Sequence, residues 1–395
     1  MTKYITPLFL IALFAFNFSC DTKQKEETIT TSDILAETFA DAAVQYKVLR
    51  DSLPEGQFPK TFENDTLKTS GSEWWCSGFY PGTLLYIYEQ TKDQEIYEEA
   101  FRILKDLEKE QFNTTTHDLG FMMYCSFGHA KLLEPKEEYV EILINSANSL
   151  ASRFDPTVGC IKSWDGEEDE YLVIIDNMMN LELLFWATQA TGDSSYYDIA
   201  VTHANTTLAN HFREDNSSYH VLNYSASSGE VKEKKTHQGY SDDSAWARGQ
   251  AWGFYGYTSM YRFTKDITYL NQAVNIAEFL LNHENMPEDN IPYWDFNAPD
   301  IPEAKRDASA AAILASGLLE LIHYVEGEQS EKYFNVAESI LMTLASEEYF
   351  AAPGTNGGFL LMHGLGHMPA GTEVDVPLTY GDYYFVEAMS RYLEL

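Results

Sequence analysis

Apolar, helix-like stretches alternate along the chain with a recurring polar turn. Four such stretches are each followed by the turn and by a second amphipathic segment, and they cover residues 79–88, 181–186, 252–263 and 310–325. The turn reads Thr-X-Asp at 91–93, 191–193 and 264–266, and a weaker copy stands at 326–328. A tyrosine and an alanine follow each copy at nearly constant distances. Each unit therefore predicts two helices joined by a short turn.

The number of these units predicts the fold. A further pair fits around residues 132–150 and an N-terminal helix fits 32–53, so about six hairpins recur at spacings of roughly 45–75 residues. We predict an all-α chain that forms one closed α6/α6 barrel over residues 32–395. An open solenoid of stacked helical pairs would give a similar periodicity.

Long connections favour the barrel over the solenoid. Three of them contain aromatic residues together with glycine, proline or both, and they cover residues 154–176, 215–242 and 287–307. Connections of this kind are too elaborate for uniform repeats and would form the rim of a central site. We expect short strands in some of them, for example at 218–224.

The first 31 residues are expected to lie outside the barrel. Lys3, an apolar run over 8–18 and Ser19-Cys20 follow the order of a secretory signal that ends at a lipidated cysteine. The run is too short to span a bilayer as a stable helix. We expect a signal peptide over 1–20, a flexible tether over 21–31, and an exported periplasmic or outer-membrane lipoprotein held only by the lipid on Cys20. Plain secretion and a retained anchor are the alternatives.

Composition narrows the possible ligands. The net charge of −35 argues against nucleic-acid binding and against a basic membrane-binding face, because both need clustered Lys and Arg. An anionic substrate would therefore need a local cationic pocket. The aromatic content of 14% suits a site that stacks on sugar rings, although large helical cores also use aromatics. Cys76, Cys125 and Cys160 are an odd set with neither a disulfide framework nor zinc-site spacing.

Two aspartates stand where helices are expected to begin. Asp118 lies in Thr-Thr-Thr-His-Asp-Leu-Gly-Phe ahead of an apolar run, and Asp176 lies in Ile-Ile-Asp-Asn-Met-Met-Asn ahead of another. Each alone is typical of a helix N-cap. Because the inner helices of an α/α barrel begin at one end, the two carboxyl groups could instead face each other and divide acid and base work.

The densest group of polar and aromatic residues lies at 236–253. It contains His237, Gln238, Arg248 and Trp252. If the helix begins near Asp243, Arg248 and Trp252 are one turn apart and form a carboxylate-binding fork beside a stacking platform. The alternative is a surface arginine that covers a core tryptophan.

Four further histidines stand near these segments or near the C-terminal end of the sequence. His117 and His220 are isolated, and isolated histidines are more often structural than catalytic. His363 and His367 are expected to be loop residues and not metal ligands, since no zinc-protease motif accompanies them.

Five segments resemble those of the unsaturated glucuronyl hydrolases, glycoside hydrolase family 88. They are Trp-Cys-Ser-Gly-Phe-Tyr-Pro-Gly at 75–82, His-Asp-Leu-Gly-Phe at 117–121, Asp-Asn-Met-Met-Asn-Leu at 176–181, the cluster at 237–253, and Pro-Leu-Thr-Tyr-Gly-Asp-Tyr-Tyr-Phe at 377–385. The resemblance implies an α6/α6 barrel, no metal or organic cofactor, and catalytic aspartates at Asp118 and Asp176. It also implies substrate contacts, which fall on Trp75, His117, His220, His237, Gln238, Arg248 and Trp252. Cys76 and Tyr80 depart from the pattern, where Thr or Ser and Trp are expected.

The resemblance also implies a reaction. The substrate would be an unsaturated uronic-acid oligosaccharide left by a polysaccharide lyase, and hydrolysis would begin at its C4=C5 double bond. Asp176 would protonate C4 and assist water at C5, while Asp118 would hold the ring hydroxyls. An unsaturated rhamnogalacturonyl hydrolase and a non-catalytic sugar-binding lipoprotein are the alternatives. The sequence at 248–252 resembles the glucuronyl hydrolases more closely than the rhamnogalacturonyl hydrolases. The aspartate pair argues against a non-catalytic protein, because sugar binding alone would not require it.

Overall fold

The computed structural model describes Met1 and residues 29–395. The expected signal peptide, the lipidation at Cys20 and nearly all of the expected tether therefore lie outside the described residues. Within the described part, no helix is long and apolar enough to cross a membrane.

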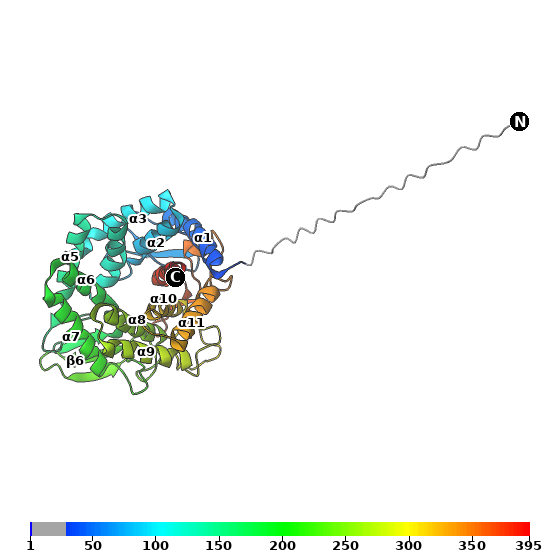
Figure 1. Cartoon of the computed structure of the whole chain (residues 1–395). Helices are drawn as coiled ribbons and strands as arrows, with labels where there is room; N and C mark the ends of the chain where they lie inside the picture. Colours follow the sequence, from blue (N-terminus) through cyan, green and yellow to red (C-terminus); the bar gives the residue numbers. More distant parts are fainter. Residues whose placement is uncertain (2–28) are drawn as a thin grey trace.

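Six pairs of helices form a closed ring (Figure 1). The inner helices are α2 (Phe79–Thr91), η2 (Gly120–Gly128), α6 (Leu181–Thr191), α8 (Ala247–Thr264), α10 (Ala308–Leu321) and α12 (Thr379–Leu393). The outer helices are α1 (Thr31–Ser52), α3 (Gln94–Leu107), α5 (Glu137–Ala151), α7 (Ser194–Asn210), α9 (Ile267–Asn282) and α11 (Glu328–Leu344). The short α4 (His129–Leu133) continues η2. The predicted α6/α6 barrel is confirmed.

The two ends of the described chain close the ring. Helix α12 packs against both α10 and α2, and α1 packs against α2 and α12. The sixth pair therefore consists of the first and last helices, which explains why the sequence shows a single helix at its start. The open solenoid is excluded because α12 contacts α2.

The recurring turn joins an inner helix to an outer helix. Its threonine hydroxyl accepts a hydrogen bond from the aspartate amide two residues later, and its aspartate side chain caps the next helix, at Asp93, Asp193 and Asp266. The middle residue has a positive φ, which ends the first helix in the left-handed conformation. The weaker fourth copy keeps only the positive φ at Gly327, and no side chain caps α11.

Short sheets cover one end of the barrel. The antiparallel pairs are β1 (Phe58–Glu63) with β2 (Thr66–Ser70), β3 (Phe154–Asp155) with β4 (Cys160–Ile161), and β8 (Gly364–His367) with β9 (Thr372–Val376). A three-stranded sheet contains β5 (Glu170–Ile174), β6 (Val221–Ser225) and β7 (Val231–Lys235). The short 3-10 helices are η1 (Glu108–Phe112), η3 (Ile175–Asn180) and η4 (Asn356–Gly358). The strand expected at 218–224 is β6, shifted by a few residues.

One expectation about these rim segments is wrong. His367 lies in β8 and His363 immediately precedes it, so they are not both loop residues. The glycines around them suggested a loop, but β8 is a short strand that pairs closely with β9. A Cβ at Gly364 would come 2.8 Å from the backbone oxygen of Val376, so the glycine permits this close approach.

Candidate active site

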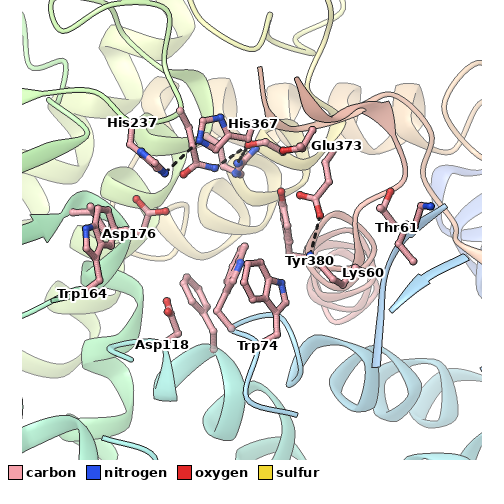
Figure 2. Close-up of a pocket in the computed structure, with 18 of the residues that line it drawn as sticks. Lys60, Thr61, Trp74, Asp118, Trp164, Asp176, His237, His367, Glu373 and Tyr380 are labelled. Carbon is pink, nitrogen blue, oxygen red and sulfur yellow. Dashed lines mark hydrogen bonds and ion pairs between the residues drawn. The ribbon is translucent and has the colours of Figure 1, made fainter. Parts of the chain in front are cut away.

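A cavity of about 660 Å³ opens at the end of the barrel where the inner helices begin. Seven of the nine residues expected to act in catalysis or binding line it, namely Trp75, His117, Asp118, Asp176, His237, Gln238 and Arg248. Figure 2 shows Asp118 and Asp176 on one side of this cavity and Trp74, Lys60 and Glu373 on the other. The other two expected residues, His220 and Trp252, lie behind its wall.

Asp118 and Asp176 are held near each other by the starts of two inner helical segments. The Phe121 amide in η2 donates a hydrogen bond of 3.0 Å to Asn180 Oδ1 at the end of η3. A Cβ at Gly120 would come 2.5 Å from Asn180 Cα, so only glycine permits this approach of the backbones. The nine-residue η2 is a π-helix, a form that is enriched at functional sites.

Neither aspartate side chain caps a helix in the way that the simpler interpretation required. Asp176 lies in the first turn of η3, which has no side-chain cap, and its Oδ2 is buried without a hydrogen-bond partner. Asp118 Oδ2 accepts a hydrogen bond of 2.5 Å from the Thr116 hydroxyl, and Asp118 Oδ1 lies 3.3 Å from His117 Nε2. Asp118 and Asp176 both line the cavity.

The two carboxyl groups lie in different surroundings. Burial raises the pKa of Asp176 to about 7, the nearby Arg248 guanidinium opposes this increase, and the charge of Asp118 adds to it. Asp118 makes hydrogen-bonding contacts that Asp176 lacks. A carboxyl group that keeps its proton near neutral pH can act as a general acid.

Arg248 does not present a free fork to the cavity. Helix α8 begins at Ala247 and not near Asp243, so Arg248 lies in its first turn and is only 1% exposed. Its guanidinium pairs with Asp307 at 3.0 Å and donates to the carbonyl oxygens of Leu365 and Gly366. Arg248 thus anchors β8 at the cavity wall and supplies a positive charge near Asp176.

Trp252 is not at the cavity wall. It is fully buried, and its ring centre lies 5.0 Å from that of Phe121, which does line the cavity. Trp252 does lie one turn after Arg248, but the cavity is at the start of α8, so this extra turn places Trp252 deeper in the barrel core. Trp252 therefore supports the wall from behind and is not the stacking platform that the sequence suggested.

The histidines and Gln238 connect the long rim segments. Gln238 Nε2 donates to the Gly366 carbonyl at 2.8 Å, and His237 Nε2 lies 3.3 Å from His367 Nε2, as the dashed line in Figure 2 marks. His220 lies behind Asp176, with its Nε2 3.7 Å from Asp176 Oδ2. The segment before α8 and the strand β8 are thus joined at the cavity.

The outer part of the cavity contains residues that sequence reasoning missed. Lys60 in β1 lies 4.1 Å above the Trp74 ring and 3.9 Å from Glu373 in β9. Trp74 is 41% exposed, unusual for so large an apolar side chain. The available signal was the turn at Asn64-Asp65, where both residues have positive φ and join the alternating segments of a β-hairpin.

Among the residues that the structure describes, no group of three or more His, Cys, Asp or Glu side chains is arranged to hold a metal ion. Cys76, Cys125 and Cys160 are free thiols.

Comparison with known proteins identifies relatives over nearly the whole chain. Residues 53–391 match the model of Glycosyl Hydrolase Family 88. The unsaturated glucuronyl hydrolase of Formosa agariphila is 43% identical, with 99% of this chain and 98% of the relative covered. The unsaturated chondroitin disaccharide hydrolase of Streptococcus pneumoniae is 34% identical, with 85% of each chain covered.

Solved structures show the same relationship. The crystal structure of an unsaturated glucuronyl hydrolase specific for heparin has a TM-score of 0.89 and 45% sequence identity, and the match covers 92% of this chain and 98% of the other. The enzyme from Bacillus sp. GL1 has a TM-score of 0.84 and 30% identity, with 90% and 96% covered. The chain belongs to Glycosyl Hydrolase Family 88.

Proposed function

We propose that Asp176 is the general acid and Asp118 the orienting carboxylate in the reaction of this protein. The protein is a glycoside hydrolase, and its activity is that of an unsaturated glucuronyl hydrolase, which releases a terminal 4,5-unsaturated glucuronic acid from an oligosaccharide. The observation that supports the roles of the two residues is the contrast between their surroundings. Asp176 is buried with a raised pKa and an unpaired oxygen, while Asp118 is hydrogen bonded.

The proposed reaction begins at the double bond of the sugar ring. The proton of Asp176 passes to C4, the π electrons form the new C4–H bond, and the ring oxygen stabilises the positive charge at C5. The Asp176 carboxylate then takes a proton from water as the water oxygen bonds to C5. The resulting hemiketal opens at its bond between C5 and the ring oxygen, and the hemiacetal formed at C1 releases the remaining sugar.

Cationic side chains are available to an anionic sugar in this cavity. The protein carries a net charge of −35, yet Lys60, Lys68 and Arg248 line the cavity. Four acidic residues line it too, namely Glu63, Asp118, Asp176 and Glu373, so these cations offer individual positive charges and not a positively charged pocket. The shape also fits, since a cavity of about 660 Å³ lies within the range typical of small-molecule sites.

The activity can be tested by loss of ultraviolet absorbance from the C4=C5 chromophore. We expect the purified protein to abolish the absorbance of unsaturated glucuronyl disaccharides without added metal and to remain active in chelator. Unsaturated rhamnogalacturonyl disaccharides should react more slowly, and faster turnover of these would favour the alternative enzyme class. Persistence of the absorbance across both sets would contradict enzymatic function and leave the sugar-binding alternative. Loss of activity in chelator would contradict the absence of a metal cofactor.

We also propose that the protein is exported and anchored by a lipid on Cys20. The support is the order of charged, apolar and small residues over 1–20. In cell fractions, Cys20→Ala should move the protein from membranes to the soluble fraction, because the short apolar run alone anchors weakly. A correctly cleaved variant that remains in the membrane fraction would rule out this anchor.

A further inference from the structure

His220 and Asp176 are delivered to the same place by adjacent strands. Asp176 follows the end of β5 and His220 precedes the start of β6, where Ile174 pairs with Val221. The Ile175 amide also donates to the His220 carbonyl at 3.1 Å. This ladder fixes the two side chains side by side, with His220 Nε2 3.7 Å from Asp176 Oδ2. Both atoms are buried, and neither has a hydrogen-bond partner among residues 29–395.

The other ring nitrogen of His220 has two partners. His220 Nδ1 lies 3.2 Å from the backbone nitrogen of His237 and 3.2 Å from that of Gln238, and both amides donate to it. A ring nitrogen that accepts a hydrogen bond carries no proton, so neutral His220 must carry its proton on Nε2. A charged imidazolium would set an Nδ1 proton against two amide protons.

The surroundings keep the ring neutral and hold it in place. Burial lowers the pKa of His220 well below its usual value, and the charges of His237, Arg248 and His367 lower it further. The ring centre lies 4.3 Å from that of Trp246. The imidazole therefore has one protonation state and one orientation.

We infer that the backbone amides of His237 and Gln238 lock His220 in the Nε2–H tautomer, which directs its N–H at Asp176 Oδ2 and leaves Oδ1 to carry the acidic proton into the cavity. This inference rests on the proposed role of Asp176. At 3.7 Å the contact is longer than a hydrogen bond, as is common for catalytic contacts before substrate binds. His220 acts as a positioning residue and does not contact the substrate.

The lock accounts for two features of the site. First, Oδ2 is buried and cannot reach the sugar, so a proton on that oxygen would be useless for protonating C4. Second, the charged groups that face Asp176 from other segments are Arg248 in α8 and Asp118 before η2, and their effects on its pKa oppose each other. Neither of them selects between the two carboxyl oxygens. The N–H of His220 makes that selection.

Two substitutions separate the two contacts of His220, which are the Nε2–H directed at Asp176 and the Nδ1 that accepts hydrogen bonds from two backbone amides. The second contact is called the backbone cap. In His220→Asn, the side-chain oxygen can still accept from the two amides, but no N–H reaches Asp176. In His220→Gln, the longer amide can place an N–H near Asp176 but loses the cap. Because a donor stabilises the carboxylate, His220→Asn should raise the pKa of Asp176 and move the alkaline limb of the kcat profile up by about one pH unit.

The expected order of activity follows from the same argument. His220→Asn should lose at least about tenfold in kcat, and His220→Gln should stay closer to the wild-type profile. If His220 only accepts hydrogen bonds from the two backbone amides, His220→Asn should keep a higher kcat than His220→Gln. Neither variant should then shift the alkaline limb of the kcat profile. His203→Gln is the matched control, because His203 Nδ1 accepts the Ile161 amide at 3.0 Å and lies outside the cavity. It should lose stability without shifting the limb.

Nitrogen-15 spectra of the histidine rings test the tautomer without any activity measurement. We expect His220 to show a protonated Nε2 and an unprotonated Nδ1 throughout pH 5 to 9, with its signal assigned by its absence from a His220 variant or, if none folds, by its correlation to the backbone. A protonated Nδ1 or a titrating ring would overturn the inference. If the tautomer is as expected but no unsaturated disaccharide is turned over, the proposed function is wrong, while the inferred tautomer of His220 still holds.

Discussion

Replacing Asp176 by Asn should abolish turnover and at the same time stabilise the protein in a pH-dependent way. Burial raises the pKa of this carboxyl from 3.8 to about 7. Below about pH 4 the carboxyl is protonated in both the folded and the unfolded chain. Between about pH 4 and pH 7 only the folded chain keeps the proton, so the free energy of unfolding falls as the pH rises. Above pH 7 the folded protein holds a buried carboxylate and the penalty is complete.

The magnitude follows from the two pKa values. One pH unit of pKa difference corresponds to about 1.4 kcal/mol, so the carboxyl costs about 2 kcal/mol at pH 5 and about 4 kcal/mol at pH 8. Asn keeps the size of the side chain and never ionises, and it relieves this cost. Any pH-independent effect of the amide cancels between the two conditions. The free energy of unfolding of Asp176→Asn, relative to wild type, should therefore rise by about 2 kcal/mol from pH 5 to pH 8.

Urea unfolding followed by tryptophan fluorescence at the two pH values measures this difference, and the loss of ultraviolet absorbance measures turnover. Loss of the general acid should reduce kcat by about 10²–10⁴-fold. Asp118→Asn is the matched control for stability, since its Oδ2 already accepts a hydrogen bond from Thr116. A stability difference that is equal at pH 5 and pH 8, or a folded variant with near wild-type turnover, would refute the assignment of Asp176.

Three further substitutions test the cavity and the packing of α12. Arg248→Lys keeps the charge but loses the paired bonds to the β8 carbonyls, so steady-state kinetics should show KM raised about tenfold or more, with a smaller fall in kcat. Asp382→Ala should lower the free energy of unfolding by about 3 kcal/mol or more, measured by urea unfolding, because two backbone amides and the Tyr46 hydroxyl lose their buried acceptor. Trp74→Ala should raise KM for disaccharides roughly fivefold with kcat nearly unchanged, because the exposed ring lies at the outer part of the cavity.

The barrel could be predicted because its signals are local. A threonine, a residue with positive φ and a capping aspartate determine the end of one helix and the start of the next within three positions. Lys92 and Lys265 adopt the same left-handed conformation as Gly192, so the predictive signal was the Thr-X-Asp turn and not a glycine. Of the closing pair, only the N-terminal helix was predicted from the sequence, because its partner α12 begins 327 residues after the end of α1, from Ser52 to Thr379.

The wall of the cavity could not be predicted in the same way because long-range contacts build it. The fork of Arg248 is occupied by carbonyl groups of β8, more than a hundred residues further along the chain. Trp252 was placed in the site by its spacing from Arg248, but it lies one turn further from the start of α8, where it packs against Phe121 in the core. Neither the start of that helix nor the position of β8 can be read from the cluster at 236–253.

Asp307 explains how Arg248 can anchor β8 at the cavity while the carboxyl group of Asp176 stays protonated. An unpaired guanidinium beside Asp176 would favour the carboxylate and lower its pKa, leaving no proton to donate at neutral pH. In this structure Asp307 pairs with Arg248 at 3.0 Å, and both side chains are almost completely buried. Asp307 offsets part of the charge of Arg248, and burial remains the largest influence on the pKa of Asp176. The fork of Arg248 can then anchor β8 at the cavity while Asp176 keeps its proton.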